Sequence, residues 1–79
     1  MAPLLDEVEI ERAVLAHLAE QPGAMDTFEG ISLWWVRMRQ LRFELEALQK
    51  VLDRLTQRAV LERVVVGADD RILYRLKRG

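Results

Sequence analysis

The sequence predicts one small domain that is mainly α-helical and ends in a β-hairpin. The chain has 79 residues and no cysteine, which leaves room for a single hydrophobic core without disulfides. Apolar residues recur with a helical period in three consecutive segments. After residue 59 the pattern changes to β-branched and alternating residues around one turn sequence. We therefore expect a single domain over residues 1–79.

The first helix is expected over residues about 5–20, where Ile10, Val14 and Leu18 recur at four-residue steps and form one apolar face. Its acidic opening turn suits the positive end of a helix dipole. His17 lies opposite the apolar face, so we expect it to be exposed. Glu11 lies within that face, and we expect a partly buried ion pair between Glu11 and an arginine of the third helix or the hairpin.

The second helix is expected over residues about 26–37. Asp26 and Glu29 have the spacing of a capping box, in which both side chains accept hydrogen bonds from backbone N–H groups at the helix start. Trp34 and Trp35 point about 100° apart on a helix. At least one of them is expected in the core, and if Trp35 fills it, Trp34 lies at its margin.

The third helix is expected over residues about 41–58 and has the strongest periodic pattern in the chain. One side is apolar at steps of four and three residues: Leu41, Leu45, Leu48, Leu52, Leu55 and Ala59. The opposite side is polar. We place a tight turn near residues 38–40, before this helix, although no proline or glycine marks it. One long helix from Thr27 to Arg58 is the alternative.

The hairpin is expected over residues about 60–66 and 71–77, on either side of the turn sequence Gly67-Ala68-Asp69-Asp70. In the second strand, Ile72, Tyr74 and Leu76 alternate with polar residues and share one face.

Three helices followed by a hairpin, in a chain this short, resemble the winged helix-turn-helix domain. The resemblance spans nearly the whole chain and is most specific over residues 48–74, where a helix leads into Val60-Leu61-Glu62-Arg63 and a basic return strand contains Tyr74. A second stretch is similar to small stand-alone bacterial winged-helix proteins: Pro22-Gly23-Ala24-Met25-Asp26-Thr27-Phe28-Glu29-Gly30-Ile31 followed by Trp34-Trp35.

Two positions depart from the family pattern. Ala59 stands where the family usually ends the helix with glycine in a left-handed turn, so we expect a different helix end here. Asp69 and Asp70 stand at the tip of the wing, where a wing that contacts DNA phosphates is expected to carry lysine or arginine.

The resemblance implies a DNA-binding regulatory protein, with the third helix in the major groove and the hairpin on the DNA backbone. The groove-facing residues near the helix start would be Arg39, Arg42, Phe43 and Glu46. Phosphate contacts would come from Arg63, Arg71, Arg75 and Lys77, assisted by Lys50 and Arg54. The alternative is a winged-helix protein-interaction module without intrinsic DNA affinity, which forms a homodimer or binds another protein through Leu33, Trp34, Val36 and Phe43.

The charge distribution favours an anionic partner in the second part of the chain, although acids also occur there. Residues 1–30 contain seven acids and one base, and residues 31–79 contain eleven bases and six acids. These counts give segment charges of −6 and +5, whose sum is the net charge of −1. Four of the acids in the basic part lie among the expected DNA contacts: Glu46, Asp53, Asp69 and Asp70.

Other classes are not supported by any motif. One histidine and no cysteine argue against a metal site, and the chain has no glycine-rich loop for a phosphate-containing cofactor. No second acid, histidine or nucleophile stands at motif spacing from Glu11, so we do not expect an enzyme. No apolar run reaches membrane-spanning length and no secretory signal is visible, so we expect a cytoplasmic protein.

Overall fold

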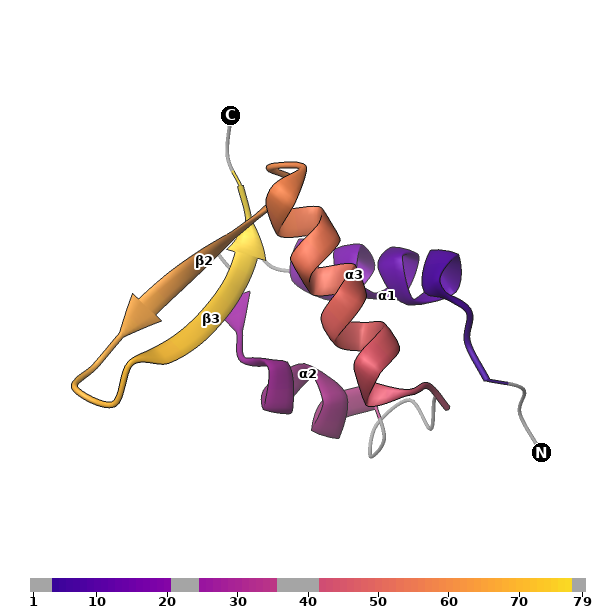
Figure 1. Cartoon of the computed structure of the whole chain (residues 1–79), viewed down its shortest axis with the longest axis horizontal. Helices are drawn as coiled ribbons and strands as arrows, with labels where there is room; N and C mark the ends of the chain where they lie inside the picture. The colour runs from indigo at the N-terminus through magenta and orange to yellow at the C-terminus, as the bar shows by residue number, and fades with distance from the viewer. Residues whose placement is uncertain (1–3, 21–24, 36–41, 78–79) are drawn as a thin grey trace.

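The computed structural model describes residues 4–20, 25–35 and 42–77. Within them the elements follow the order α1 (Glu7–Ala19), β1 (Met25–Asp26), α2 (Phe28–Trp34), α3 (Leu45–Gln57), β2 (Leu61–Val66) and β3 (Arg71–Leu76). The helices pack together and the β2–β3 hairpin projects beyond them to one side (Figure 1). The predicted class, mainly helical with a hairpin at the C-terminal end, is confirmed at this level.

The sheet is antiparallel and has the strand order β1-β3-β2. In the hairpin, Leu61 lies opposite Leu76 and Val65 lies opposite Ile72. On the other side of β3, Asp26 of β1 lies opposite Tyr74. The hairpin was predicted but β1 was not, because a strand of two residues has no period that a sequence pattern can display.

The core lies where the helices meet the start of the hairpin. Its members come from five elements and from the residue after α2: Ile10, Val14, Leu18, Ile31, Trp35, Leu48, Val51, Leu52, Leu55, Leu61 and Tyr74. The expected face of the first helix is confirmed, and Trp35 is buried, as expected of at least one tryptophan. The expected seam of the third helix is wrong at two positions, since Leu45 is 58% exposed and Ala59 is also exposed.

The starts of α1 and α2 are capped by side chains, at α2 not by the predicted one, whereas α3 begins at Leu45 without a side-chain cap. At α1, Asp6 Oδ1 accepts from Glu9 N at 2.8 Å, and Glu9 Oε1 accepts from Asp6 N at 3.1 Å. At α2 the expected box of Asp26 and Glu29 is replaced by Thr27, whose Oγ1 accepts from Gly30 N at 2.9 Å. Asp26 precedes the cap because β1 holds its backbone in the sheet.

Helix α3 begins at Leu45, four residues later than predicted. Residues 42–44 are not helical, so the alternative of one long helix from Thr27 to Arg58 is wrong. Residues 42 and 43 contact other parts of the chain in two ways. Leu5 N donates to Arg42 O at 2.8 Å, and the Phe43 ring meets the Trp35 ring edge to face at 5.2 Å between centroids. The predicted turn at 38–40 lies outside the described residues.

Helix α3 ends in a Schellman motif with alanine in the left-handed position. Ala59 has a φ of 62°, Ala59 N donates to Thr56 O at 3.1 Å, and Val60 N donates to Leu55 O at 2.9 Å. The expectation of a different helix end at Ala59 is therefore wrong. The two hydrogen bonds and the turn into β2 hold alanine in a conformation that glycine would adopt more readily.

Candidate interaction surface

The outer face of α3 is exposed and carries charges of both signs. Glu46, Lys50, Asp53 and Gln57 recur there at helical spacing. Arg42 and Phe43 do not belong to this face, because both precede the helix. Phe43 is half-buried against the core, so its predicted place on an exposed helix face is wrong. Arg39 lies outside the described residues.

Two ion pairs connect α1 to the second half of α3. Arg54 Nη2 binds Glu7 Oε1, and one turn further along both helices Arg58 Nη1 lies 3.8 Å from Glu11 Oε1. The ion pair expected for Glu11 is thus confirmed, with its side chain 26% exposed. Arg54 was predicted to assist DNA binding, but its guanidinium is already engaged by Glu7.

Two predicted phosphate contacts of the hairpin are also paired within the chain. Arg75 Nε donates to Glu62 Oε1 at 2.5 Å across the two strands. Arg71 Nη2 lies 3.8 Å from Asp69 Oδ2, in a pair that is exposed on both sides. Three predicted contacts are exposed and form no ion pair among the described residues, namely Lys50, Arg63 and Lys77.

The far end of the hairpin is apolar and uncovered. Val65 is 60% exposed, Val66 is 40% exposed and Ile72 is 42% exposed. Val65 and Ile72 are opposite each other and therefore share the sheet face that Leu61 and Tyr74 use in the core. These three residues are named here the hairpin end. Val65 and Ile72 are exposed because the strands extend past the helices that cover their other half (Figure 1), whereas Val66 lies on the opposite face of the sheet.

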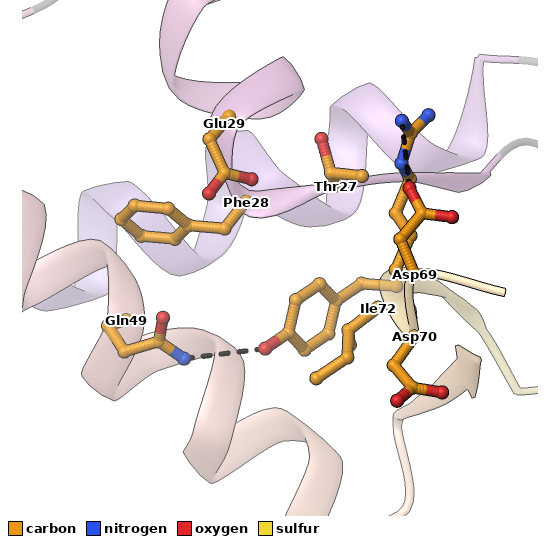
Figure 2. Close-up of a pocket in the computed structure, with 9 residues that line it drawn as sticks. Thr27, Phe28, Glu29, Gln49, Asp69, Asp70 and Ile72 are labelled. Carbon is orange, nitrogen blue, oxygen red and sulfur yellow. Dashed lines mark hydrogen bonds and ion pairs between the residues drawn. The ribbon is translucent and has the colours of Figure 1, made fainter. Parts of the chain in front are cut away.

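A cleft of about 450 Å³ lies between the hairpin turn, the start of α2 and α3. Figure 2 shows Gln49 of α3 facing the tyrosine of β3, and Gln49 Nε2 donates to Tyr74 Oη at 3.3 Å and to Asp53 Oδ1 at 2.9 Å. Ile72 lies beside this contact, and the acids of the cleft are Glu29, Asp69 and Asp70. Its acidic lining disfavours a phosphate backbone inside the cleft.

The surface predicted for a protein partner is only partly described. Leu33 of α2 is exposed at 55%, whereas Val36 lies outside the described residues. Phe43, as stated above, packs on Trp35. The side chain of Trp34 also lies outside the described part of the chain, so Leu33 is the one predicted partner residue that is exposed in the described part.

His17 is less exposed than predicted. Its side chain is 15% exposed, and its Nε2 atom lies 3.5 Å from Asp26 Oδ2. Asp26 also accepts a hydrogen bond from Thr27 N at 2.8 Å. Because β1 brings Asp26 to the end of α1, a residue opposite the apolar face still becomes half-buried. The periodic pattern of the helix alone could not predict the contact between His17 and Asp26.

The sequence interpretation missed the hairpin end as an exposed surface. One signal was available, because Val64, Val65 and Val66 are consecutive and therefore place valines on both faces of the strand. A small domain covers at most part of such a strand. Among the described residues, no group of histidine, aspartate and glutamate could hold a metal ion, and no helix there is long and apolar enough to cross a membrane.

The chain matches no model of a known protein family, no curated protein and no solved structure. Its class is thus described by the order of its elements alone, which is, in the described part of the chain, three helices, with a short strand after the first, followed by a hairpin.

Proposed function

We propose that the chain is a winged-helix domain that acts as a protein-interaction module and uses its hairpin end as the contact surface. The order of elements supports the fold assignment, because α2 and α3 are followed directly by the hairpin, which would be the wing. The observation that carries the function is the exposure of Val65, Val66 and Ile72. Apolar side chains exposed together at one end of a hairpin, here on both of its faces, are typical of surfaces that bind another protein.

The charges around the hairpin end favour a protein over a nucleic acid as its partner. Asp69 and Asp70 adjoin it in the turn, and Arg75 and Arg71 have carboxylate neighbours within the chain. A DNA phosphate approaching this end would meet two carboxylates before it met a lysine or arginine that lacks a carboxylate partner. An apolar contact with a polar rim is the usual composition of a protein interface.

DNA binding with a regulatory role is the second candidate function. It is favoured by one observation, the exposure of Lys50, Arg63 and Lys77 without an ion pair in the described part of the chain. In a winged helix these residues would come from the recognition helix and the wing. Such a surface would bind DNA through phosphates, so its affinity would fall steeply as the salt concentration rises.

Photo-crosslinking separates the two functions. A photo-reactive amino acid is placed at Ile72 in the hairpin end, at Lys50 on α3, and at Ala16, an exposed control position on α1. In the native host we expect a protein crosslink from the Ile72 position and none from Ala16. A nucleic-acid crosslink from Lys50, without a protein crosslink from Ile72, would contradict the protein-interaction function and support the DNA-binding function.

A further inference from the structure

The outer edge of β2 is open. The strand order β1-β3-β2 places β2 at the margin of the sheet, and no described backbone group bonds to its outer side. Figure 1 shows β2 along the outside of the hairpin, with β3 between it and β1. A strand edge of this kind presents a row of unpaired N–H and C=O groups that can bind a further strand.

The protection that proteins commonly give to an edge strand is confined to the first half of β2. Its sequence is Leu61-Glu62-Arg63-Val64-Val65-Val66, with both charges near the start. The remaining three residues are valines, which favour the extended conformation and carry no charge that would repel another strand. There is no proline in the strand. The valine half is therefore the part of the edge that is open to pairing.

We propose that two copies of this chain pair their β2 edges antiparallel about a two-fold axis at Val64 or Val65, which joins their sheets into one. This inference rests on the proposed function, since it names the partner of the interaction surface. In such an isologous contact the residue at the axis lies opposite its own copy, and residues on either side pair in reverse order.

The charges of β2 disfavour an axis in the first half of the strand. An axis at Glu62 or Arg63 would place two like charges directly opposite each other, which destabilises a strand pair. With the axis at Val64, Arg63 lies opposite Val65 and Glu62 lies opposite Val66. With the axis at Val65, Val64 lies opposite Val66. Both valine registers place the axis valine opposite its own copy and keep like charges apart.

The pairing also covers side chains that are exposed in the single chain. Val65, at 60% exposure, and Val66, at 40% exposure, point to opposite faces of the sheet. A flat patch docking on one face would cover only one of them. An added strand contacts both, so edge pairing accounts for the apolar character of both faces of β2.

Single cysteines test the register directly, because the natural chain contains none. We expect Val64→Cys or Val65→Cys to form an intermolecular disulfide under mild oxidation at least about tenfold faster than Ile72→Cys, since only the axis residue lies within disulfide distance of its copy. Ala16→Cys on α1 is the control for random collisions. Equal rates at all four positions, or a faster reaction at Ile72, would overturn the proposal.

Sedimentation of the full chain gives the second readout. We expect a dimer at high concentration, and a dissociation constant at least about tenfold higher for Val65→Lys than for Ile72→Lys, because lysine at the edge opposes strand pairing directly. Both positions lie on the same face of the hairpin and opposite each other. A strict monomer would overturn the self-pairing, while a crosslink from Ile72 to a different protein would leave the proposed function standing.

Discussion

Ala59 combines a left-handed backbone with a complete helix-ending motif, and it is the clearest strained position among the described residues. Its φ of 62° is one that a residue with a Cβ atom adopts at a cost of about 1 kcal/mol. The surrounding bonds from Ala59 N and Val60 N keep the conformation in place. The resemblance to winged-helix sequences singles out the position, whereas only the structure shows that alanine adopts the conformation of glycine.

Replacing this alanine by glycine should stabilise the chain. We expect Ala59→Gly to raise the free energy of unfolding by about 0.5–1 kcal/mol, because glycine removes the left-handed penalty. Urea unfolding followed by circular dichroism measures the change. Ala16→Gly is the control, since a glycine in the exposed middle of α1 should lower the same free energy by about 1 kcal/mol. A loss of stability in Ala59→Gly would contradict the strain.

Trp35 fills the largest single volume in the core and should be the least replaceable side chain. It is 1% exposed and meets the Phe43 ring edge to face. Removing a buried tryptophan costs about 3–5 kcal/mol, which is comparable to the whole stability of a small domain, about 5–15 kcal/mol.

We therefore expect Trp35→Ala to unfold at or near room temperature in a thermal scan followed by circular dichroism. Leu33→Ala, two residues earlier in α2, is the matched control. Because Leu33 is 55% exposed, its removal should change the free energy of unfolding by no more than about 0.5 kcal/mol. A cooperative transition of Trp35→Ala near that of the natural chain would show that the core is arranged differently.

At the scale of elements, the sequence predicts what repeats and misses what depends on a distant partner. The period of Ile10, Val14 and Leu18 and the alternation around Tyr74 are local properties, so α1 and the hairpin could be predicted. Strand β1 exists through its pairing with β3. Likewise, Phe43 packs on Trp35 just before α3 begins, and this contact has no signature in the local sequence.

In the candidate site, too, the sequence shows the type of each residue but not the residue that it contacts. A sequence identifies an arginine but not the carboxylate that meets it, as Arg54 and Glu7 demonstrate across a separation of 47 residues. In the same way, the sequence does not show that Arg75 meets Glu62 across β2 and β3. Only residues whose surroundings are solvent, such as Lys50 and Arg63, keep the accessibility that their sequence positions indicate.

The two pairs between α1 and α3 should contribute modestly to the docking of these helices. The Arg54 and Glu7 side chains are 40% and 44% exposed, so solvent screens their attraction. In a double-mutant cycle of Glu7→Gln and Arg54→Gln we expect a coupling energy of about 0.2–1 kcal/mol, measured by urea unfolding. It should shrink in about 1 M salt, where the screening length is about 3 Å.

A matched cycle of Glu7→Gln with Arg63→Gln controls for the change in net charge. Arg63 is exposed on β2 and forms no ion pair with the described residues of α1. The effects of these two substitutions should therefore add. A coupling as large as that of the Glu7 and Arg54 pair would mean that the effect arises from overall charge and not from the contact.

At the scale of the whole molecule, part of the charge asymmetry between the two ends of the sequence is neutralised inside the fold. Glu7 and Glu11 belong to the acidic segment, and Arg54 and Arg58 belong to the basic one. The pairs between them bring opposite charges together at one helix contact. The positive charge of the second segment is thus less available to an external partner than its count of bases indicates.

The acidic turn should oppose any approach of the hairpin to DNA. We expect the double variant Asp69→Asn with Asp70→Asn to bind random duplex DNA several-fold more tightly than the natural chain at low salt. The change removes two negative charges and takes the net charge from −1 to +1, and it also removes the carboxylate beside Arg71. Asparagine tolerates the left-handed backbone of Asp70, whose φ is 53°.

Fluorescence anisotropy over a range of salt concentrations measures this binding, and a variant with the same net charge supplies the control. Ala16→Lys with Ala19→Lys adds two charges to exposed positions of α1, so it should gain less affinity if the hairpin is the surface that meets DNA. The advantage of the asparagine variant should disappear at high salt, because phosphate contacts weaken through counterion release. Tight binding by the natural chain that neither variant changes would place DNA on another surface and contradict the opposing role of the turn.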